Sequence, residues 1–528
     1  MTDSFDLTTQ PWIPVETLEG RFLELSTRDV LRDAHQLRGL ADASPLVCAM
    51  LTRHLLAILH RTYDGPKSMR EWSVIVGAKR FDERAVNRYL DSVADRMDLF
   101  HPTQPFGQAR GLIKSFGRPQ DITPIHELEV EWSAWGVGQT LFRHRSDEDG
   151  GMMPPSRAAR ALLAHQGFAT GGLVKKPNEP ISATGAPFVG AAVVVLRGES
   201  LFGTLVSNLL HYDPEHARPV PLGAETDACA WEQGVPPPTL PLLQEPKVRP
   251  RGYLDMLTWL SRRIELVGGV HGVGGFIRAV YKGVEEGSPR DPMVTYARDD
   301  KRGWRAITVD PVRAFWRSAN ALFETNRGDT ARFVRPAAIA LVTDPDALSL
   351  LGASRMYTVE VAGVSAFQSR VDSVQGDRVS AVARVFADPD ARTAVDEALG
   401  VAEVAVKALR GAVFIFAKRA LSAGDRDPDT KDVSSLAKSF GAEASAWSAL
   451  GVEFDVFLRG LGEDADAALA LFATRARAVA VDVFLLVTDR PDSTGRWLKA
   501  RALAERTLRQ GLKETYVAAE GAAEEARS

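Results

Sequence analysis

DPDARTAVDEALGVAEVAVKALRGAVFIFAKRAL, residues 388–421, opens a region that is rich in Ala, Leu and Val and has helical periodicity. Asp388 followed by Pro389 is typical of a helix start, because Asp caps free N–H groups and Pro fits the first helical position. The pattern predicts a helix to about Leu421. Further helices are expected at about 432–459, 463–487 and 493–519. Four long helices with short connections predict an up-down bundle.

Composition differs before residue 388, where short strands and helices are mixed. The hydrophobic patterns predict a hairpin from strands 12–15 and 22–25, a largely buried helix at 44–61, a helix at 253–266 with Trp259 and Leu260 on its buried side, and a strand at 188–196. Residues 100–157 have few periodic segments and are expected to form a long loop region. The sequence therefore predicts an α+β fold, with a large mixed N-terminal domain (1–387) and a C-terminal four-helix bundle (388–528).

Charge and cysteine content narrow the possible functions. Lys and Arg number 64 against 68 Asp and Glu, so a protein coated in nucleic acid by bulk charge is disfavoured, although a local basic face can exist. The two cysteines, Cys48 and Cys229, indicate a reducing compartment without disulfides or a cysteine-based zinc site. The polar N-terminus does not resemble a signal peptide, and no apolar run is long enough for a membrane span. A cytoplasmic protein without membrane contact is expected.

A glycine-bearing segment, QGFATGGLVKKPNEPISATGAP at residues 166–187, is the first candidate for ligand contact. Glycine lets a backbone approach a ligand closely and adopt positive φ. Lys175 and Lys176 follow directly and could meet phosphates. The alternative is a surface turn that carries two lysines.

The segment GVSAFQSR, residues 363–370, is a second candidate, expected as a polar loop after a strand at 357–361. Phe367 beside Gln368 could act as a wedge, since an inserted side chain unstacks base pairs in proteins that deform DNA. The alternative places Phe367 in the core and leaves Gln368 as a surface residue.

Catalytic motifs are missing from the sequence. It has no GxxxxGK[ST] phosphate loop and no GxSxG nucleophile elbow. The glycines of residues 268–275 do not follow the GxGxxG spacing, so a cofactor-using enzyme centred there is a weak alternative. His211 and His216 are better read as surface histidines than as metal ligands. We expect a protein that is not an enzyme and has no cofactor or metal.

Several separated segments, taken in order, resemble the large subunit of the type I-E CRISPR surveillance complex Cascade, the CasA family. The matching pieces are QPWIPV (10–15), PFGQ (105–108), ITP (122–124), the helix–glycine-loop–strand unit at 158–198 that ends in VVVLRG, GVSAFQ (363–368), and the C-terminal bundle. Each motif is short, but together they cover nearly the whole chain.

The resemblance implies a protein that reads the motif adjacent to the target in double-stranded DNA from the minor groove, while guide RNA reads the target by base pairing and an R-loop forms. It assigns motif recognition to the glycine loop, wedge insertion to a glutamine and its neighbours, and a groove contact to a hairpin cation. The corresponding residues here are Gly167, Thr170, Gly171 and Gly172 for the loop, Gln368 with Phe367 and Ala366 for the wedge, and Lys282 or else Arg278 for the cation.

The resemblance also implies protein and RNA partners. Phe142 matches an aromatic residue that contacts the RNA 5′ handle and the neighbouring backbone subunit, and Arg143 and Arg145 would reinforce that contact through phosphates. The bundle would touch the small-subunit dimer and help to recruit the helicase-nuclease. Some relatives carry a cysteine cluster where this chain has residues 267–275. No cysteine occurs there, so no metal is expected. A scaffold subunit without direct DNA readout remains the alternative.

Overall fold

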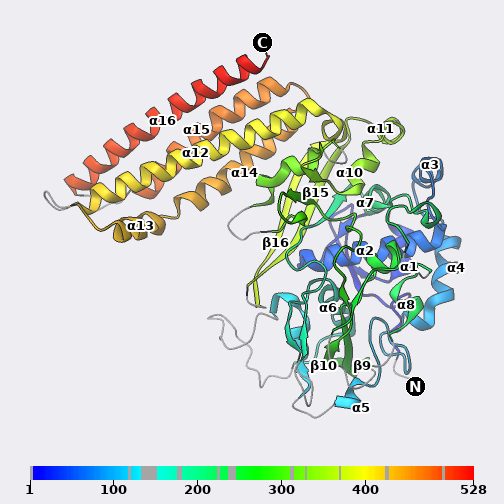
Figure 1. Cartoon of the computed structure of the whole chain (residues 1–528). Helices are drawn as coiled ribbons and strands as arrows, with labels where there is room; N and C mark the ends of the chain where they lie inside the picture. Colours follow the sequence, from blue (N-terminus) through cyan, green and yellow to red (C-terminus); the bar gives the residue numbers. More distant parts are fainter. Residues whose placement is uncertain are drawn as a thin grey trace. The chain divides into compact units, whose positions relative to one another are not determined.

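The computed structural model describes residues 4–116, 121–132, 151–174, 181–222, 226–235, 245–309, 314–326, 330–367, 370–422, 427–489 and 494–527. The chain divides into two compact units (Figure 1). The first contains Met1–Pro311 and Asn326–Arg378, and the second contains Val312–Thr325 and Val379–Ser528. The predicted α+β class is confirmed. Val312–Thr325 belongs with the helical unit, a grouping that the sequence did not indicate.

The first unit combines helices with small sheets. Its helices are α1 (Thr27–Asp33), α2 (Pro45–Tyr63), α3 (Met69–Gly77), α4 (Glu83–Val93), α5 (Leu112–Phe116), α6 (Pro155–Phe168), α7 (Leu201–Asn208), α8 (Ala230–Gln233), α9 (Tyr253–Leu257), α10 (Ala337–Val342) and α11 (Pro345–Leu351). Its strands are β1 (Ile13–Thr17), β2 (Phe22–Leu25), β3 (Leu37–Leu40), β4 (Thr123–Pro124), β5 (Gly172–Val174), β6 (Ile181–Ala183), β7 (Val193–Arg197), β8 (Lys247–Val248), β9 (Arg262–Gly269), β10 (Gly272–Val280), β11 (Gly283–Val284), β12 (Tyr296–Asp299), β13 (Gly303–Ala306), β14 (Phe333–Val334), β15 (Met356–Phe367) and β16 (Arg370–Val382).

Helix α2 is the central helix of this unit. Ser44 caps it by accepting a hydrogen bond from the backbone N–H of Val47, and Pro45 occupies its first turn. Its side chains are buried on nearly every face, as expected for a helix that is apolar all round. It contacts α4, α6, α7 and α9 and the strands β7 and β15. The predicted buried helix at 44–61 is therefore confirmed.

The sheets confirm one predicted hairpin and correct a predicted helix. Strand β1 pairs antiparallel with β2, as expected, and β3 completes that sheet. The helix predicted at 253–266 is wrong, because α9 ends at Leu257 and β9 begins at Arg262, where it pairs with β10. Pairing along β9 outweighs the helical pattern of its apolar residues. The predicted strand at 188–196 begins later, at Val193.

The glycines of residues 268–275 have a role in the β9–β10 hairpin itself. Gly268 and Gly272 have φ of +151° and +146°, and a Cβ at Gly268 would lie 2.4 Å from the Gly272 carbonyl oxygen. A Cβ at Gly275 would lie 2.5 Å from Ile122 Cγ2. The close approach of neighbouring chain segments therefore accounts for three of the glycines in this motif.

Strands β15 and β16 replace most of the loop predicted at 363–370. Strand β15 continues through residue 367, and β16 begins at Arg370. The two are neighbours in a sheet of order β16-β15-β7. Gly363 lies within β15, where a Cβ would be 2.7 Å from Val309 Cγ2. The polar segment is therefore a strand up to residue 367, because its backbone is paired within this sheet.

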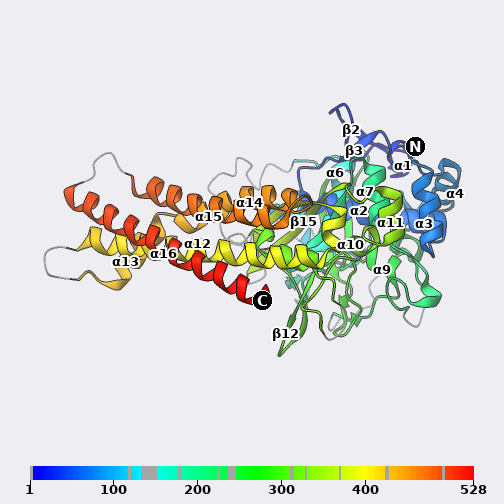
Figure 2. The same ribbon diagram turned by 90° about the horizontal axis from the view of Figure 1, so that it is seen from above.

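The second unit is a helical bundle. Its helices are α12 (Pro389–Leu421), α13 (Thr430–Ser439), α14 (Ala442–Gly460), α15 (Ala465–Thr488) and α16 (Gly495–Arg527), and the 3-10 segment Phe315–Phe323 packs on α12. Helices α12, α15 and α16 lie side by side in both views (Figures 1 and 2). Asp388 caps α12 as predicted, accepting from the Asp390 N–H. The single helix expected at 432–459 is two, since Gly441 has φ +62° between α13 and α14.

Aromatic side chains fill one end of the bundle. The Phe416 ring of α12 lies 4.7 Å from the Trp497 ring and 6.2 Å from the Phe484 ring, measured between centroids. Phe414, two residues earlier on the same helix, is 37% exposed. None of the helices in the described ranges has the length and apolar character that a bilayer span requires.

Replacing Phe416 with Ala should lower the free energy of unfolding by about 3–5 kcal/mol, because the change removes buried apolar surface and leaves a cavity among the aromatic rings. Chemical denaturation followed by circular dichroism measures the change. Phe414→Ala is the matched control and should cost less than about 1 kcal/mol. Equal losses for both variants would contradict the assigned core.

Among the described residues of the first unit, three histidines are buried. Burial lowers the pKa of His54 and His165 to about 3 and that of His60 to about 4. His54 is surrounded by the rings of Trp12, Phe106 and Trp231, which offer no charge to an imidazolium. In an unfolded chain a histidine binds its proton near pH 6.5. The unfolded state therefore takes up protons first as the pH falls, and the folded state loses stability.

Lowering the pH from 7 to 5.5 should reduce the free energy of unfolding by about 1 kcal/mol for each of these histidines. Denaturation at the two pH values measures the difference. His54→Phe removes one titrating group while keeping a ring among the aromatic neighbours, so its stability should depend less on pH. A variant with the same pH dependence as the parent chain would contradict burial of a neutral His54.

Candidate nucleic-acid interface

The glycine segment forms a short hairpin from β5 and β6. Gly172 pairs with Ala183, Leu173 with Ser182, and Val174 with Ile181. Val174 and Ile181 are buried against Val280 of β10, whereas Leu173 on the other face is 68% exposed. The hairpin thus has one face packed on the unit and one face that can meet a ligand. Lys175 and Lys176 lie outside the described residues.

The three glycines predicted to form the ligand-binding loop differ in their surroundings. A Cβ at Gly171 would lie 2.9 Å from the Gly185 nitrogen and 3.0 Å from the Ala183 carbonyl oxygen. Gly172 has φ +123°, a conformation that other residues rarely adopt. Gly167, by contrast, is buried in α6, where a Cβ would lie 2.7 Å from Met50 Sδ. Gly171 and Gly172 therefore shape the hairpin, whereas Gly167 lies in the core, away from any ligand.

A buried arginine holds both ends of the hairpin. Arg262, 2% exposed, donates from Nη2 to the carbonyl oxygens of Thr170, at 3.2 Å, and Thr184, at 2.5 Å. These two residues precede β5 and follow β6. Burial lowers the pKa of Arg262 to about 10, and the Glu245 carboxylate opposes that shift. The guanidinium therefore anchors the hairpin at its base.

Glu245 links the buried Arg262 to Lys247 at the surface. Its Oε1 lies 3.6 Å from Arg262 Nη1, and its Oε2 accepts from the backbone N–H and the hydroxyl of Thr184 at 3.0 and 2.6 Å. Lys247 donates to the same Oε2 at 2.8 Å. Hydrogen bonds and the nearby cations lower the pKa of Glu245 against the opposing effect of burial. No local pattern in the sequence points to Arg262, Glu245 or Lys247, because Glu245 meets Arg262, and Lys247 meets Thr184, only through the fold.

The cation predicted at a hairpin tip is placed differently. Lys282 follows β10 in the connection to β11, with Nζ 3.0 Å from Asp255 Oδ1 and 3.9 Å from the centroid of the Trp259 ring. Burial lowers its pKa, against the opposing effect of Asp255. Arg278 lies within β10 and is half-buried, and burial lowers its pKa also. The placement of either residue at an exposed hairpin tip is therefore wrong.

The remaining candidate residues are only partly described. Ala366 is exposed near the end of β15, and Phe367 is the last residue of that strand. Gln368 lies outside the described residues, as do Phe142, Arg143 and Arg145. The wedge and the RNA contact therefore stay predictions.

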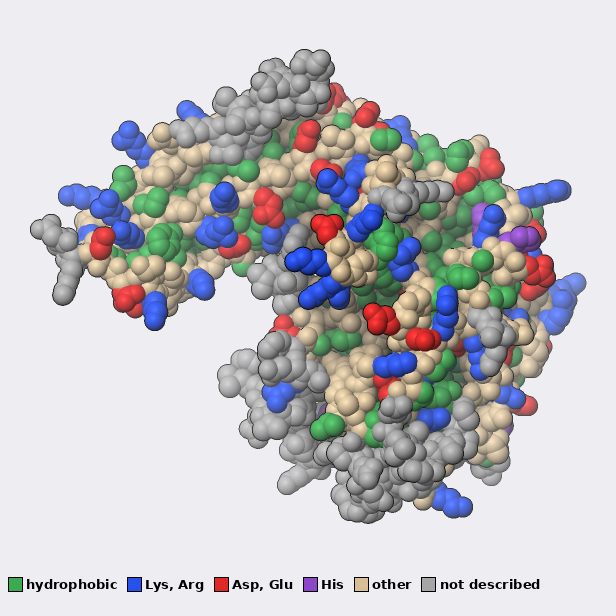
Figure 3. Space-filling view, viewed as in Figure 1, with side chains coloured by type: hydrophobic (Ala, Val, Ile, Leu, Met, Phe, Trp, Pro, Cys, Tyr) green, Lys and Arg blue, Asp and Glu red, His purple; other side chains and the backbone are tan. Residues whose placement is uncertain are grey.

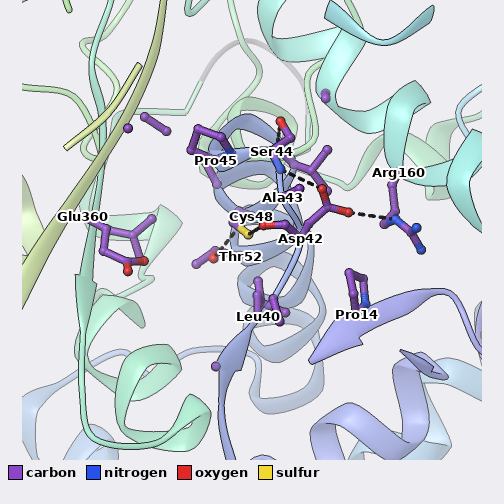
Figure 4. A pocket seen from close by; sticks show the side chains of 18 of the residues that line it. Pro14, Leu40, Asp42, Ala43, Ser44, Pro45, Cys48, Thr52, Arg160 and Glu360 are labelled. Carbon is purple, nitrogen blue, oxygen red and sulfur yellow. Dashed lines mark hydrogen bonds and ion pairs between the residues drawn. The ribbon is translucent and has the colours of Figure 1, made fainter. Parts of the chain in front are cut away.

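A large cavity of about 1460 Å³ lies beside the first turn of α2 (Figure 4). Asp42 accepts from the backbone N–H of Ser44 at 2.9 Å and pairs with Arg160 Nε at 3.0 Å. Glu131 accepts a hydrogen bond from the Ser44 hydroxyl, and burial raises the pKa of this carboxyl. Arg197 pairs with Glu360 at 2.9 Å. These arginines are matched by carboxylates, so the cavity wall offers little net charge to an anion.

The two thiols are poor nucleophiles where the fold places them. Burial raises the pKa of Cys48, in the wall of this cavity, to about 12. Burial also raises the pKa of Cys229 well above its ordinary value.

Over the described ranges no three His, Cys, Asp or Glu side chains form a group that could hold a metal ion. His216 pairs with Asp213 at 2.7 Å, an exposed contact.

These features define a class of protein: an α+β unit that presents an anchored glycine hairpin, followed along the chain by a helical bundle. The model of the family described as CRISPR-associated protein Cse1 (CRISPR_cse1) matches residues 6–483. The chain belongs to this Cse1 family.

Individual relatives agree with that assignment. The chain is 30% identical over 523 residues to the CRISPR-associated protein CasA/Cse1 of Thermus thermophilus, covering 97% of this chain and 98% of the relative. A structure of Thermus thermophilus CasA (Cse1) has a TM-score of 0.79 at 27% identity, covering 97% of this chain and all of that one (100%). A chain of a CRISPR RNA-guided surveillance complex shares the fold, with a TM-score of 0.69 at 20% identity over 96% of this chain and 99% of that chain.

Replacing Arg262 with Ala should loosen the glycine hairpin, because two carbonyl oxygens and a buried carboxylate lose their cation. Amide hydrogen exchange in β5 and β6 should become faster by about 10-fold or more. Mass spectrometry of peptides that cover residues 168–186 measures the rate. Arg160→Ala, which breaks a pair elsewhere in the same unit, should leave these amides unchanged. Unaltered exchange in the Arg262 variant would contradict the anchoring role.

Proposed function

We propose that this chain is the large subunit of an RNA-guided surveillance complex of the Cascade type. In this proposal it recognises the motif adjacent to the target in double-stranded DNA from the minor groove and starts strand opening, so that guide RNA can pair and an R-loop can form. It performs no bond chemistry. Membership of the Cse1 family supports the place in the complex. The anchored glycine hairpin is the observation that carries the DNA contact.

The bare backbone at the glycine end of the hairpin suits the minor groove. That groove is about 6 Å wide, too narrow for a helix or a two-stranded ribbon to enter whole, and offers a degenerate pattern of acceptors. The half-exposed backbone of Gly171 and Gly172 has no side chains to hold it away from base edges. Because Arg262 already fixes both ends of the hairpin, little ordering entropy is lost on binding. Recognition through backbone and a degenerate groove favours tolerance of several motif sequences.

The strand pair β15–β16 supports the proposed wedge. These strands are 12 and 13 residues long, and Gln368 lies between them in the sequence. Two paired strands form a stiff support for a short connection. Inserting a side chain between base pairs costs a few kcal/mol, which other contacts to the duplex must offset. In the proposal Gln368 enters the duplex, with Phe367 and Ala366 beside it.

The remaining contacts of the proposed subunit involve RNA, DNA phosphates and protein. Phe142, Arg143 and Arg145 would contact the guide RNA handle and the backbone subunit, while Lys175 and Lys176 would meet DNA phosphates. The helical bundle would contact the small-subunit dimer and help to recruit the helicase-nuclease. Phosphate contacts of this kind make binding dependent on salt.

The test uses the assembled complex carrying Gly171→Asp. An added side chain at Gly171 would collide with the backbone of residues 183–185 and place a negative charge at the groove. Affinity for target duplex should fall by about 10-fold or more. Gly274→Asp is the matched control, because Gly274 is exposed and its Cβ would have no neighbour within 4 Å among the described residues. Binding is measured with duplexes that carry and lack the adjacent motif.

The variant Gln368→Ala distinguishes opening of the DNA strands from binding of the duplex. This variant should retain most of the duplex affinity but show less unpairing of the bases next to the motif, followed by a fluorescent base analogue. Complex assembly, measured by size-exclusion chromatography, should be unchanged in both variants. Loss of assembly with unaltered duplex binding by the remaining complexes would favour the scaffold alternative and contradict the proposal.

A further inference from the structure

Among the described residues, two lysines lie near the glycine hairpin, and their surroundings differ. Lys282 immediately precedes β11. Strand β11 pairs in parallel with β8, and this pairing places Gly283 opposite Lys247. The two cations therefore occupy neighbouring positions on one small sheet. Their contacts decide which of them can meet DNA when the hairpin does.

Lys282 is held inside the fold. Its side chain is 13% exposed, and its ammonium is paired with Asp255, which is itself 1% exposed. The Trp259 ring covers another side of the ammonium at 3.9 Å. Withdrawing Lys282 toward DNA would leave the Asp255 carboxylate buried without its cation, which is strongly unfavourable. The contacts of Lys282 therefore indicate a structural role.

Lys247 is held at the surface instead. Its side chain is 44% exposed, and its ammonium donates to Thr184 Oγ1 at 2.9 Å and to Glu245 Oε2 at 2.8 Å. Thr184 is the residue that follows β6, so the ammonium lies directly at the base of the hairpin. A Cβ at Gly283 would come within 2.5 Å of this ammonium. The glycine at 283 therefore leaves the room that Lys247 needs.

Arg262, Glu245 and Lys247 together leave one positive charge on the surface of the protein. Glu245 lies between two cations, the buried Arg262 and the half-exposed Lys247. One carboxylate and two cations leave the group with one net positive charge, and the exposed member carries it to the solvent. Glu285 and Glu286 follow β11 nearby and are exposed, so this surface is not a broad basic patch. Arg249 is exposed on the same segment, and Lys247 is the described cation whose ammonium is fixed at the base of the hairpin by Thr184 and Glu245.

We propose that Lys247 is a cation held in position beside the glycine hairpin, and that it contacts a phosphate of the target duplex at the edge of the minor groove. Lys282 instead holds the segment between β10 and β11 through Asp255. The inference rests on the proposed function, in which the hairpin meets DNA. Because Lys247 and the hairpin share Thr184 and Glu245, docking of the hairpin brings this ammonium to the duplex in a fixed position.

The experiment measures duplex affinity of the assembled complex over a series of salt concentrations. Lys247→Gln removes the charge but keeps a donor for Thr184. It should lower affinity by about 5- to 10-fold near 0.1 M salt and reduce the slope of log affinity against log salt by about 0.9, the loss of one phosphate contact. Lys247→Arg should restore both quantities. Lys301→Gln changes charge equally at an exposed residue of the β12–β13 turn and should change neither.

Lys282→Gln gives the opposite pattern if the inference holds. The salt slope should stay within error of the parent complex, while the melting temperature of the subunit falls because Asp255 loses its partner. A reduced slope for Lys282→Gln together with an unchanged slope for Lys247→Gln would overturn the inference. An unchanged slope for Lys247→Gln while Gly171→Asp still loses duplex binding would also overturn it and leave the proposed function intact. If Gly171→Asp binds duplex normally as well, the proposed function itself fails.

Discussion

The buried contact between Arg262 and Glu245 is the constraint on which the candidate interface depends. Both side chains are removed from water, so each must be satisfied by polar groups of the fold. Arg262 meets this need with the carbonyl oxygens on either side of the glycine hairpin, and Glu245 meets it with Thr184 and Lys247. The same contacts that neutralise two buried charges therefore determine the position of the hairpin.

Glycine at position 171 is required for packing within the hairpin as well as for the proposed approach to DNA. The Cβ of any other residue at 171 would collide with the opposite end of the hairpin, whether or not DNA is present. The bare backbone that can approach base edges is thus already demanded by folding. This coupling means that loss of a glycine changes both shape and contact. Its effect on binding must be compared with that of a glycine whose neighbourhood is open, such as Gly274.

The sequence predicts those helices and strands that are determined by neighbouring residues, and not those that depend on long-range contacts. Asp388 and Pro389 predict the start of α12, and hydrophobic segments predict the β1–β2 hairpin. Residues 262–266 are predicted as the end of a helix, but pairing with β10 makes them a strand. The sequence predicts Lys282 as an exposed cation, because its partner Asp255 lies 27 residues away in sequence. No local pattern identifies Lys247, because its contact with Thr184 spans 63 residues.

Pairing of charges within the chain bears on the proposed recognition of DNA. Arg160 pairs with Asp42, Arg501 with Asp489 and Lys282 with Asp255. On the face in Figure 3, Lys and Arg are interspersed with Asp and Glu. In the proposed function, a face of this kind would attract DNA weakly at any sequence, because nonspecific affinity grows with the number of phosphates neutralised. Weak nonspecific binding would leave a larger share of the affinity to shape-dependent contacts, such as the proposed contact made by the anchored hairpin and Lys247. Selectivity would then arise from how well the backbone fits the groove rather than from the charge of the subunit.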